Sequence, residues 1–126
     1  MGLDINKENI INKGALVGNF GAKVDAPNGR VCLLFEGFFD TSCAEKFFGE
    51  YTRAKASVDL SKTSLYIDAK GLKPFPQEAL DSAGEIYKDY LSFKDIKIVE
   101  PDNVTAKMQL HRVLKSNGIE DRFEFV

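Results

Sequence analysis

The order of hydrophobic and polar residues along this chain predicts strands and helices in turn. Alternating apolar residues and short apolar runs predict five strands, over about residues 15–26, 31–39, 65–69, 95–99 and 123–126. Apolar residues spaced three and four apart predict three helices, one beginning near residue 41 and two over about residues 76–91 and 105–117. The predicted order is therefore ββαβαβα followed by a short terminal strand.

The second predicted strand carries apolar side chains on both faces. They are Val31, Leu33 and Phe35 on one face, and Cys32, Leu34 and Phe38 on the other. A strand of this kind belongs inside a sheet, where both of its faces are covered. The Asn28-Gly29 pair before it predicts a hairpin with the first strand. Either residues 1–13 or a second copy of the chain is expected to cover the second apolar face.

Strands that alternate with helices predict right-handed crossovers and a largely parallel sheet, to which the hairpin adds an antiparallel strand. Residues 95–99 alternate apolar with charged residues, so this strand is expected to bury mainly one face. We therefore predict an α/β fold, with a mixed β-sheet and helices packed mainly on one face. Residues 1–13 are interpreted as a lead-in segment and residues 14–126 as a single domain.

Three short signals mark the ends of helices. Ser42 and Glu45 have the spacing of a capping box at the start of the first helix. Asn103 is interpreted as a cap of the third helix rather than as a glycosylation site. Gly118 is predicted to end that helix in the left-handed conformation, with Ile119 packing back on its last turn.

Composition narrows the class of protein. The 126 residues are 44% hydrophobic and 29% charged, and the net charge is −2. This balance is ordinary for a globular domain and offers no field that would attract nucleic acid. No apolar run approaches the roughly 20 residues of a membrane span. Two cysteines and no signal-peptide pattern favour reduced thiols and a location in the cytoplasm.

The residue types and spacings needed for catalysis or cofactor binding are not found. His111 is the single histidine, and it is interpreted as a solvated side chain beside Lys107 and Lys115. With no second histidine and no nearby cysteine, a metal site is not expected there. No serine, histidine and acid can be grouped by spacing into a catalytic set. The chain is therefore expected to be no enzyme and to use no cofactor.

Three stretches resemble a known family by their order and spacing: LYIDAKGLKPFPQEAL, then IKIVEP, then AKMQLHRVLKSNGIEDRFEF. They are similar to the STAS domain, the fold of bacterial anti-sigma-factor antagonists. The matching positions are Asp68, Gly71 and Leu72 in a turn, Val113, Leu114, Gly118 and Ile119 around the last helix, Phe123 in the last strand, and Asp40 before the first helix. The resemblance spans residues 31–126 and implies the same α/β fold.

The chain differs from this family at the position whose phosphorylation acts as a switch. The resemblance implies a phosphorylated serine or threonine at the start of the second helix. Aligned on Gly71 and Leu80, the chain has Gln77 there, which carries no hydroxyl group to phosphorylate. The neighbouring Glu78 supplies a fixed negative charge where a helix stabilises an anion. The resemblance therefore implies that the fold is kept, the phospho-switch is lost, and any partner is bound constitutively.

Two surfaces are candidates for docking. The first surrounds the start of the second helix, with the partner-binding residues Pro74, Phe75, Gln77, Glu78, Asp81 and Glu85. The second is the solvent side of the third helix, with Met108, Arg112 and Lys115 beside His111. Both are either plain solvated helix faces or charged docking surfaces. Phe75 is either presented to a partner or plugs the end of the sheet.

The expected function is protein binding by a non-catalytic regulatory or scaffold module without a phospho-switch. The resemblance implies an anti-sigma factor, a kinase or a stressosome-like assembly as the protein partner, and a homodimer stays open as well. No nucleic acid and no membrane span are expected. The alternative is a small-molecule or lipid carrier, since some STAS relatives serve transport systems. An elongated apolar pocket between sheet and helices would favour that alternative.

Overall fold

The computed structural model describes residues 18–38 and 41–126, and at residues 18–19, 41–43, 77–79 and 81–82 it describes the backbone alone. Its main elements are β1 (Gly18–Asp25), β2 (Arg30–Gly37), α1 (Thr41–Ala56), β3 (Ser64–Leu72), α2 (Gln77–Asp89), β4 (Asp95–Val99), α3 (Val104–Ser116) and β5 (Phe123–Phe125). Short 3-10 turns lie between several of them, among them η4 (Tyr90–Ser92) and η5 (Glu120–Arg122). The order of the elements is the predicted one.

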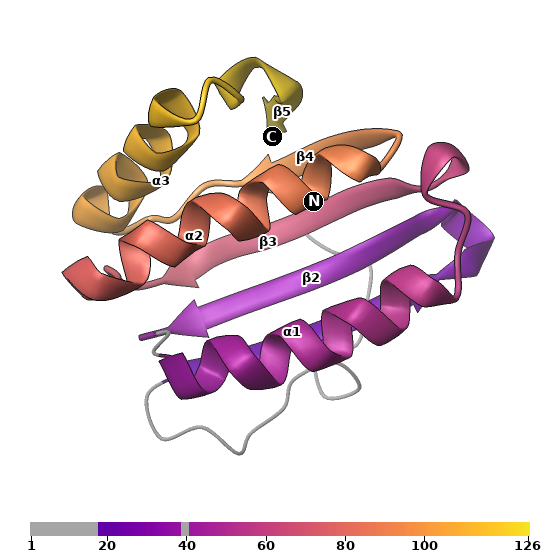
Figure 1. The fold of residues 1–126 in the computed structure, drawn as a ribbon, viewed down its shortest axis with the longest axis horizontal. Helices are drawn as coiled ribbons and strands as arrows, with labels where there is room; N and C mark the ends of the chain where they lie inside the picture. Colours follow the sequence, from indigo (N-terminus) through magenta and orange to yellow (C-terminus); the bar gives the residue numbers. More distant parts are fainter. Residues whose placement is uncertain (1–17, 39–40) are drawn as a thin grey trace.

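The five strands form one mixed sheet in the order β1-β2-β3-β4-β5. β1 pairs antiparallel with β2, and the other neighbours pair in parallel. A helix joins each parallel pair, and because the sheet grows in one direction, right-handed crossovers put these helices on one face. Figure 1 shows α1 and α2 over the same face, with α3 beyond α2. The predicted α/β fold is confirmed, and β2 is an internal strand.

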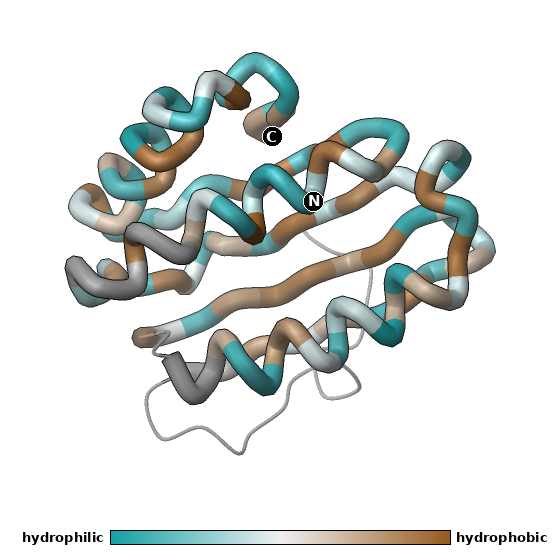
Figure 2. Tube along the Cα trace, viewed as in Figure 1, coloured by the Kyte–Doolittle hydropathy of each residue, from teal (hydrophilic) through white to brown (hydrophobic). Residues whose placement is uncertain are grey.

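The hydrophobic core lies between this face and the helices. One continuous cluster of buried side chains joins the strands to the helices: Val31, Leu33, Leu65, Ile67, Ile96 and Ile98 from β2, β3 and β4, and Phe47, Tyr51, Tyr87, Leu110 and Leu114 from α1, α2 and α3. In Figure 2, the hydrophobic colour runs along β2, whereas α1 alternates between hydrophobic and hydrophilic. A strand covered on both faces and a helix covered on one produce this contrast.

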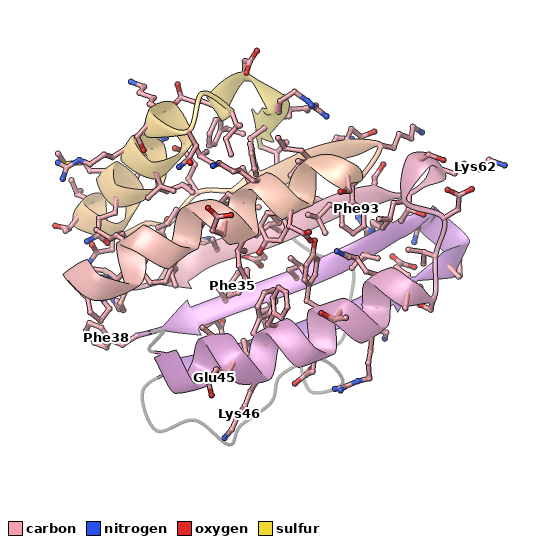
Figure 3. The ribbon with its side chains drawn as sticks, viewed as in Figure 1. Phe35, Phe38, Glu45, Lys46, Lys62 and Phe93 are labelled. Carbon is pink, nitrogen blue, oxygen red and sulfur yellow. The ribbon has the colours of Figure 1, made fainter. Side chains whose placement is uncertain are left out.

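The opposite face of β2 is also buried. Cys32 and Leu34 point away from the helices and are 0% and 1% exposed. Burial raises the pKa of the Cys32 thiol to about 11, so this thiol stays protonated at neutral pH. Phe38, which was predicted to share this face, follows the end of β2 and is 55% exposed (Figure 3). Residues 1–13, one of the two predicted covers, lie outside the described residues.

The hairpin and the ends of α3 form as predicted. Gly29 adopts the left-handed conformation with φ 61°, and its N–H donates to the Ala26 carbonyl at 3.0 Å. The Asn103 side chain accepts a hydrogen bond from the Ala106 N–H at 3.0 Å, so Asn103 is the N-cap of α3. Gly118 has φ 68°, and Ile119 is buried as expected of a helix that ends in this way.

One predicted cap and one predicted boundary were wrong. α1 begins at Thr41, as predicted, so Ser42 lies inside the helix and is not its cap. β3 continues to Leu72, three residues past the predicted end, because the pairing with β2 shifts register and places Gly71 opposite Glu36. The added length comes from a β-bulge, in which the Asp68 carboxylate accepts a hydrogen bond from the Lys70 N–H at 3.1 Å.

Candidate functional site on helices α2 and α3

Helices α2 and α3 pack against each other over the half of the sheet that ends in β5 (Figure 1). Gly84 of α2 is buried at their contact, where an added Cβ would lie 2.7 Å from Asn117 Nδ2. The Asn117 amide is held in turn by a hydrogen bond to the Val113 carbonyl at 2.8 Å. The missing side chain at Gly84 therefore lets the two helices approach closely, and their outer sides form a common surface.

The loop before α2 is anchored to α3 by Gln109. Its Oε1 accepts a hydrogen bond from the Phe75 N–H at 2.8 Å, and its Nε2 donates to the Phe75 carbonyl at 3.1 Å. The Phe75 ring is half-buried and packs against the core. Of the two alternatives for this ring, the structure therefore favours packing. α2 then begins after Pro76, which occupies the N-cap position without a side-chain hydrogen bond.

The residues predicted to bind a partner are spread over this loop and the first turns of α2. Pro74 and Phe75 are half-buried in the loop. The Glu85 side chain is 80% exposed and lies 3.9 Å from the Lys88 ammonium group. Three others belong to α2 by their backbone, but their side chains lie outside the described residues: Gln77, Glu78 and Asp81. The predicted surface is therefore described only at its edges.

The outer side of α3 carries a shallow hollow. Within the described part of the chain, its lining residues all belong to this helix: Val104, Lys107, Met108, His111, Arg112, Lys115 and Ser116. Val104 and Met108 lie one turn apart and are 70% and 59% exposed. Because lysine and arginine stems are apolar, the hollow has a largely apolar surface with cationic groups at its rim.

The charge of α3 contrasts with that of the whole chain. The helix has the sequence VTAKMQLHRVLKS, with three lysine or arginine residues, one histidine and no acid, whereas the chain has net charge −2. Lys107 lies 3.9 Å from a Glu100 oxygen. In the described part of the chain, neither Arg112 nor Lys115 has a carboxylate within ion-pair distance. The C-terminal half of the hollow therefore presents two cations with no ion-pair partner among the described residues.

His111 is not the solvated side chain that the sequence predicted. Its Nδ1 lies 2.7 Å from Glu120 Oε2, and its Nε2 lies 2.5 Å from Glu100 Oε2. The ring also stacks on Phe125 of β5, with 4.8 Å between ring centroids, and the side chain is only 30% exposed. His111 therefore ties the middle of α3 to the end of β4 and to the C-terminal segment.

Contacts on both ring nitrogens fix the protonation of His111. Only the imidazolium form can donate to two carboxylates at once. The hydrogen bonds with Glu120 and Glu100 accordingly raise the pKa of His111 above its ordinary value, against a smaller opposing effect of burial. The positive charges of Lys107 and the protonated His111 ring balance the negative charges of the two carboxylates. The net positive charge of the α3 surface then resides on Arg112 and Lys115.

The protein is expected to lose stability as the pH rises through the folded-state pKa of His111. A raised pKa means that the folded state holds the proton more tightly. The resulting gain in stability is complete below the unfolded-state pKa of 6.5 and is lost above the folded-state pKa. Denaturant unfolding at about pH 6 and about pH 9 should show this loss, and His111→Gln should reduce it. Because His111 is the only histidine, equal losses in both proteins would contradict the assignment.

A second polar cluster joins α1 to α2. The Tyr51 hydroxyl donates to Asp89 Oδ2 at 2.6 Å, and the Lys55 ammonium group donates to the same oxygen at 2.8 Å. Burial raises the pKa of Asp89, but these hydrogen bonds outweigh it and lower the pKa below its usual value. Burial and the Asp89 contact raise the pKa of Tyr51. At neutral pH Asp89 is therefore ionised and Tyr51 keeps its proton. The cluster holds α1 and α2 together.

Within residues 18–38 and 41–126, no three His, Cys, Asp or Glu side chains are grouped so that they could hold a metal ion. The helices of this part are too short or too polar to cross a bilayer. Comparison with models of known protein families and with curated proteins gives no match. The resemblance to the STAS domain therefore rests on the residues quoted for it. What the outer side of α3 offers chemically is apolar contact and positive charge, which are means of binding.

Proposed function

We propose that the protein is a non-catalytic regulatory or scaffold module that acts in the cytoplasm by binding another protein through its α2–α3 surface. The observation that carries the proposal is the exposure of Val104 and Met108, at 70% and 59%, within the hollow on α3. Neighbouring apolar side chains that stay exposed inside a polar rim are typical of docking sites. Methionine is also suited to a contact that must adapt to its partner.

The start of α2 belongs to the same proposed surface. Gln109 fixes the loop at Phe75 to α3, so a partner meets the two elements as one rigid unit. With Gln77 in place of a phosphorylated residue and Glu78 as a fixed charge, the binding state does not change through phosphorylation. The STAS resemblance suggests an anti-sigma factor, a kinase or a stressosome-like assembly as the partner.

A small-molecule or lipid carrier is the weaker candidate. It would need an apolar pocket between the sheet and the helices. In this space the Tyr51 ring packs against Phe47, Tyr90 and Phe93, with centroid distances of 5.6, 5.4 and 6.4 Å. The hollow lies instead on the outer side of α3, where its length and cationic rim suit a protein partner better than an enclosed ligand.

Cross-linking in cells tests the proposed function. A photoreactive amino acid in place of Met108 is expected to form an adduct with a specific protein, identified by mass spectrometry. The same probe in place of Lys46, which points outward from α1 (Figure 3), should not form this adduct. The purified partner should then bind the purified protein, and Met108→Asp should weaken that binding. The same adducts from both positions, or purified proteins that do not associate, would exclude docking at α3.

A further inference from the structure

We propose that the hollow on α3 binds an acidic amphipathic helix of the partner, one whose apolar residues and carboxylates lie at opposite ends of the contact. This inference rests on the proposed function and specifies the chemistry of the partner. Its basis is the order of side chains along α3, together with charges that have no counterpart in the described part of the chain.

Apolar and cationic side chains are separated along α3. Val104 and Met108 occupy its first half, and Arg112 and Lys115 its second half. These four residues follow one another at intervals of three or four, so they form one stripe on the outer side of the helix. At 1.5 Å per residue the stripe is about 16 Å long, the length of roughly three helical turns. A partner segment must therefore present apolar groups first and anionic groups one to two turns later.

The charges on α3 indicate that the partner segment is negatively charged. Glu100 and Glu120 are both engaged by His111, and in the described part of the chain neither Arg112 nor Lys115 has an ion pair. Both cations are exposed and stand at the rim of an apolar surface. Carboxylates that approach these cations gain attraction and meet no competing acid on α3, which contains none. Like charges brought to the same place would be repelled, so basic segments are selected against.

A helix fits this surface better than an extended segment. The backbone groups of α3 are bonded within the helix and offer no strand edge, so contact is restricted to side chains. A partner helix satisfies its own backbone and can place residues at intervals of three or four along the same stripe. The neutral cluster of Lys107, His111 and the two glutamates holds the middle of α3 rigid beneath that contact.

Two other polyanions are less suited to this surface. Nucleic acid binds through phosphate groups, which gain nothing from Val104 and Met108, and the chain as a whole has net charge −2. An anionic membrane attracts cationic helices, but it normally receives a longer and continuous apolar face. The exposed apolar face of α3 consists of Val104 and Met108, which is short for an anchor in lipid.

A designed peptide provides the test with the full-length protein. The probe is a fluorescent helical peptide of about four turns, with two leucines one turn apart followed by two glutamates one turn apart. The control peptide has lysines in place of the glutamates. Fluorescence anisotropy should show binding of the acidic peptide, weakening with added salt, and at least about tenfold weaker binding of the control.

Protein variants locate the contact. Arg112→Glu with Lys115→Glu should weaken binding of the acidic peptide at least about tenfold and improve binding of the lysine peptide. The matched control is Lys46→Glu with Arg53→Glu, which reverses the same two residue types on exposed positions of α1 and should leave both affinities unchanged. Circular dichroism of each variant checks that the fold is kept.

Several results would overturn the inference. These are no binding of the acidic peptide, equal binding of both peptides, or an unchanged affinity after Arg112 and Lys115 are reversed. Sedimentation with phosphatidylserine vesicles in the absence of peptide binding would assign the surface to membranes instead. If cross-linking at position 108 finds a partner that contacts α3 through a basic or neutral segment, the proposed function stands and only this inference fails.

Discussion

Replacing Tyr51 with alanine is expected to lower the free energy of unfolding by about 3–5 kcal/mol. Tyr51 is fully buried, and its ring stacks on Phe47 at 5.6 Å and meets Tyr90 edge-on at 5.4 Å. Alanine would leave a cavity where rings from α1 and η4 meet. It would also take a hydrogen bond from Asp89, which would keep only Lys55 as its partner. Denaturant unfolding monitored by circular dichroism measures the loss.

Two further variants separate the causes of this effect. Tyr51→Phe keeps the ring and removes only the hydrogen bond to Asp89, so a loss of about 1–3 kcal/mol is expected. Phe48→Ala removes a neighbouring ring from the same helix, but Phe48 is 48% exposed and should cost less than about 1.5 kcal/mol. If Tyr51→Ala costs no more than Phe48→Ala, the cluster does not hold α1 to the rest of the core.

Leu110→Ala is expected to cost about 2–5 kcal/mol, because Leu110 is 2% exposed on the inner side of α3. Met108 stands two residues earlier on the same helix and is 59% exposed, so Met108→Ala should change stability by less than about 0.5 kcal/mol. Thermal and denaturant unfolding of both variants give the comparison. A loss below about 0.5 kcal/mol for Leu110→Ala would mean that α3 faces the sheet by another side.

The contrast between these two positions also matters for the docking experiments. A residue whose truncation leaves the fold intact can be changed to test binding without a second effect. Met108, Arg112 and Lys115 were predicted to lie on the solvent side of the third helix, and all three are exposed. Variants at these positions should therefore report on binding rather than on folding.

Elements whose signals are local were predicted closely from the sequence. β4 has the predicted bounds, because Ile96 and Ile98 alternate with polar neighbours in a short strand before Pro101. Asn103 and Gly118 act as predicted, since a cap requires only residues within one turn of the helix. Pairing signals are longer-ranged. Gly71 looked like a turn residue, and only the register with Glu36 shows that it belongs to β3.

The polar clusters could not be predicted for the same reason. His111 meets carboxylates 9 and 11 residues away, on segments that reach it only after α3 has packed on the sheet. Tyr51 and Asp89 are 38 residues apart. Helical spacing showed which side chains share a face with His111, but it could not show that β4 ends and η5 begins beside it. The part of the hollow at Val104 was not predicted, because the solvent-side set of the third helix began at Met108.

The strand order has a consequence for how the chain folds. Each strand lies beside the strand before it in the sequence, so every new pairing closes a loop of a single helix or hairpin. Contacts of short sequence separation favour rapid folding. They also allow the sheet to grow in the order of synthesis, from the β1-β2 hairpin outward. β5 follows the other four strands in the sequence and lies at the edge of the sheet beside β4, so those four strands can pair before β5 is added.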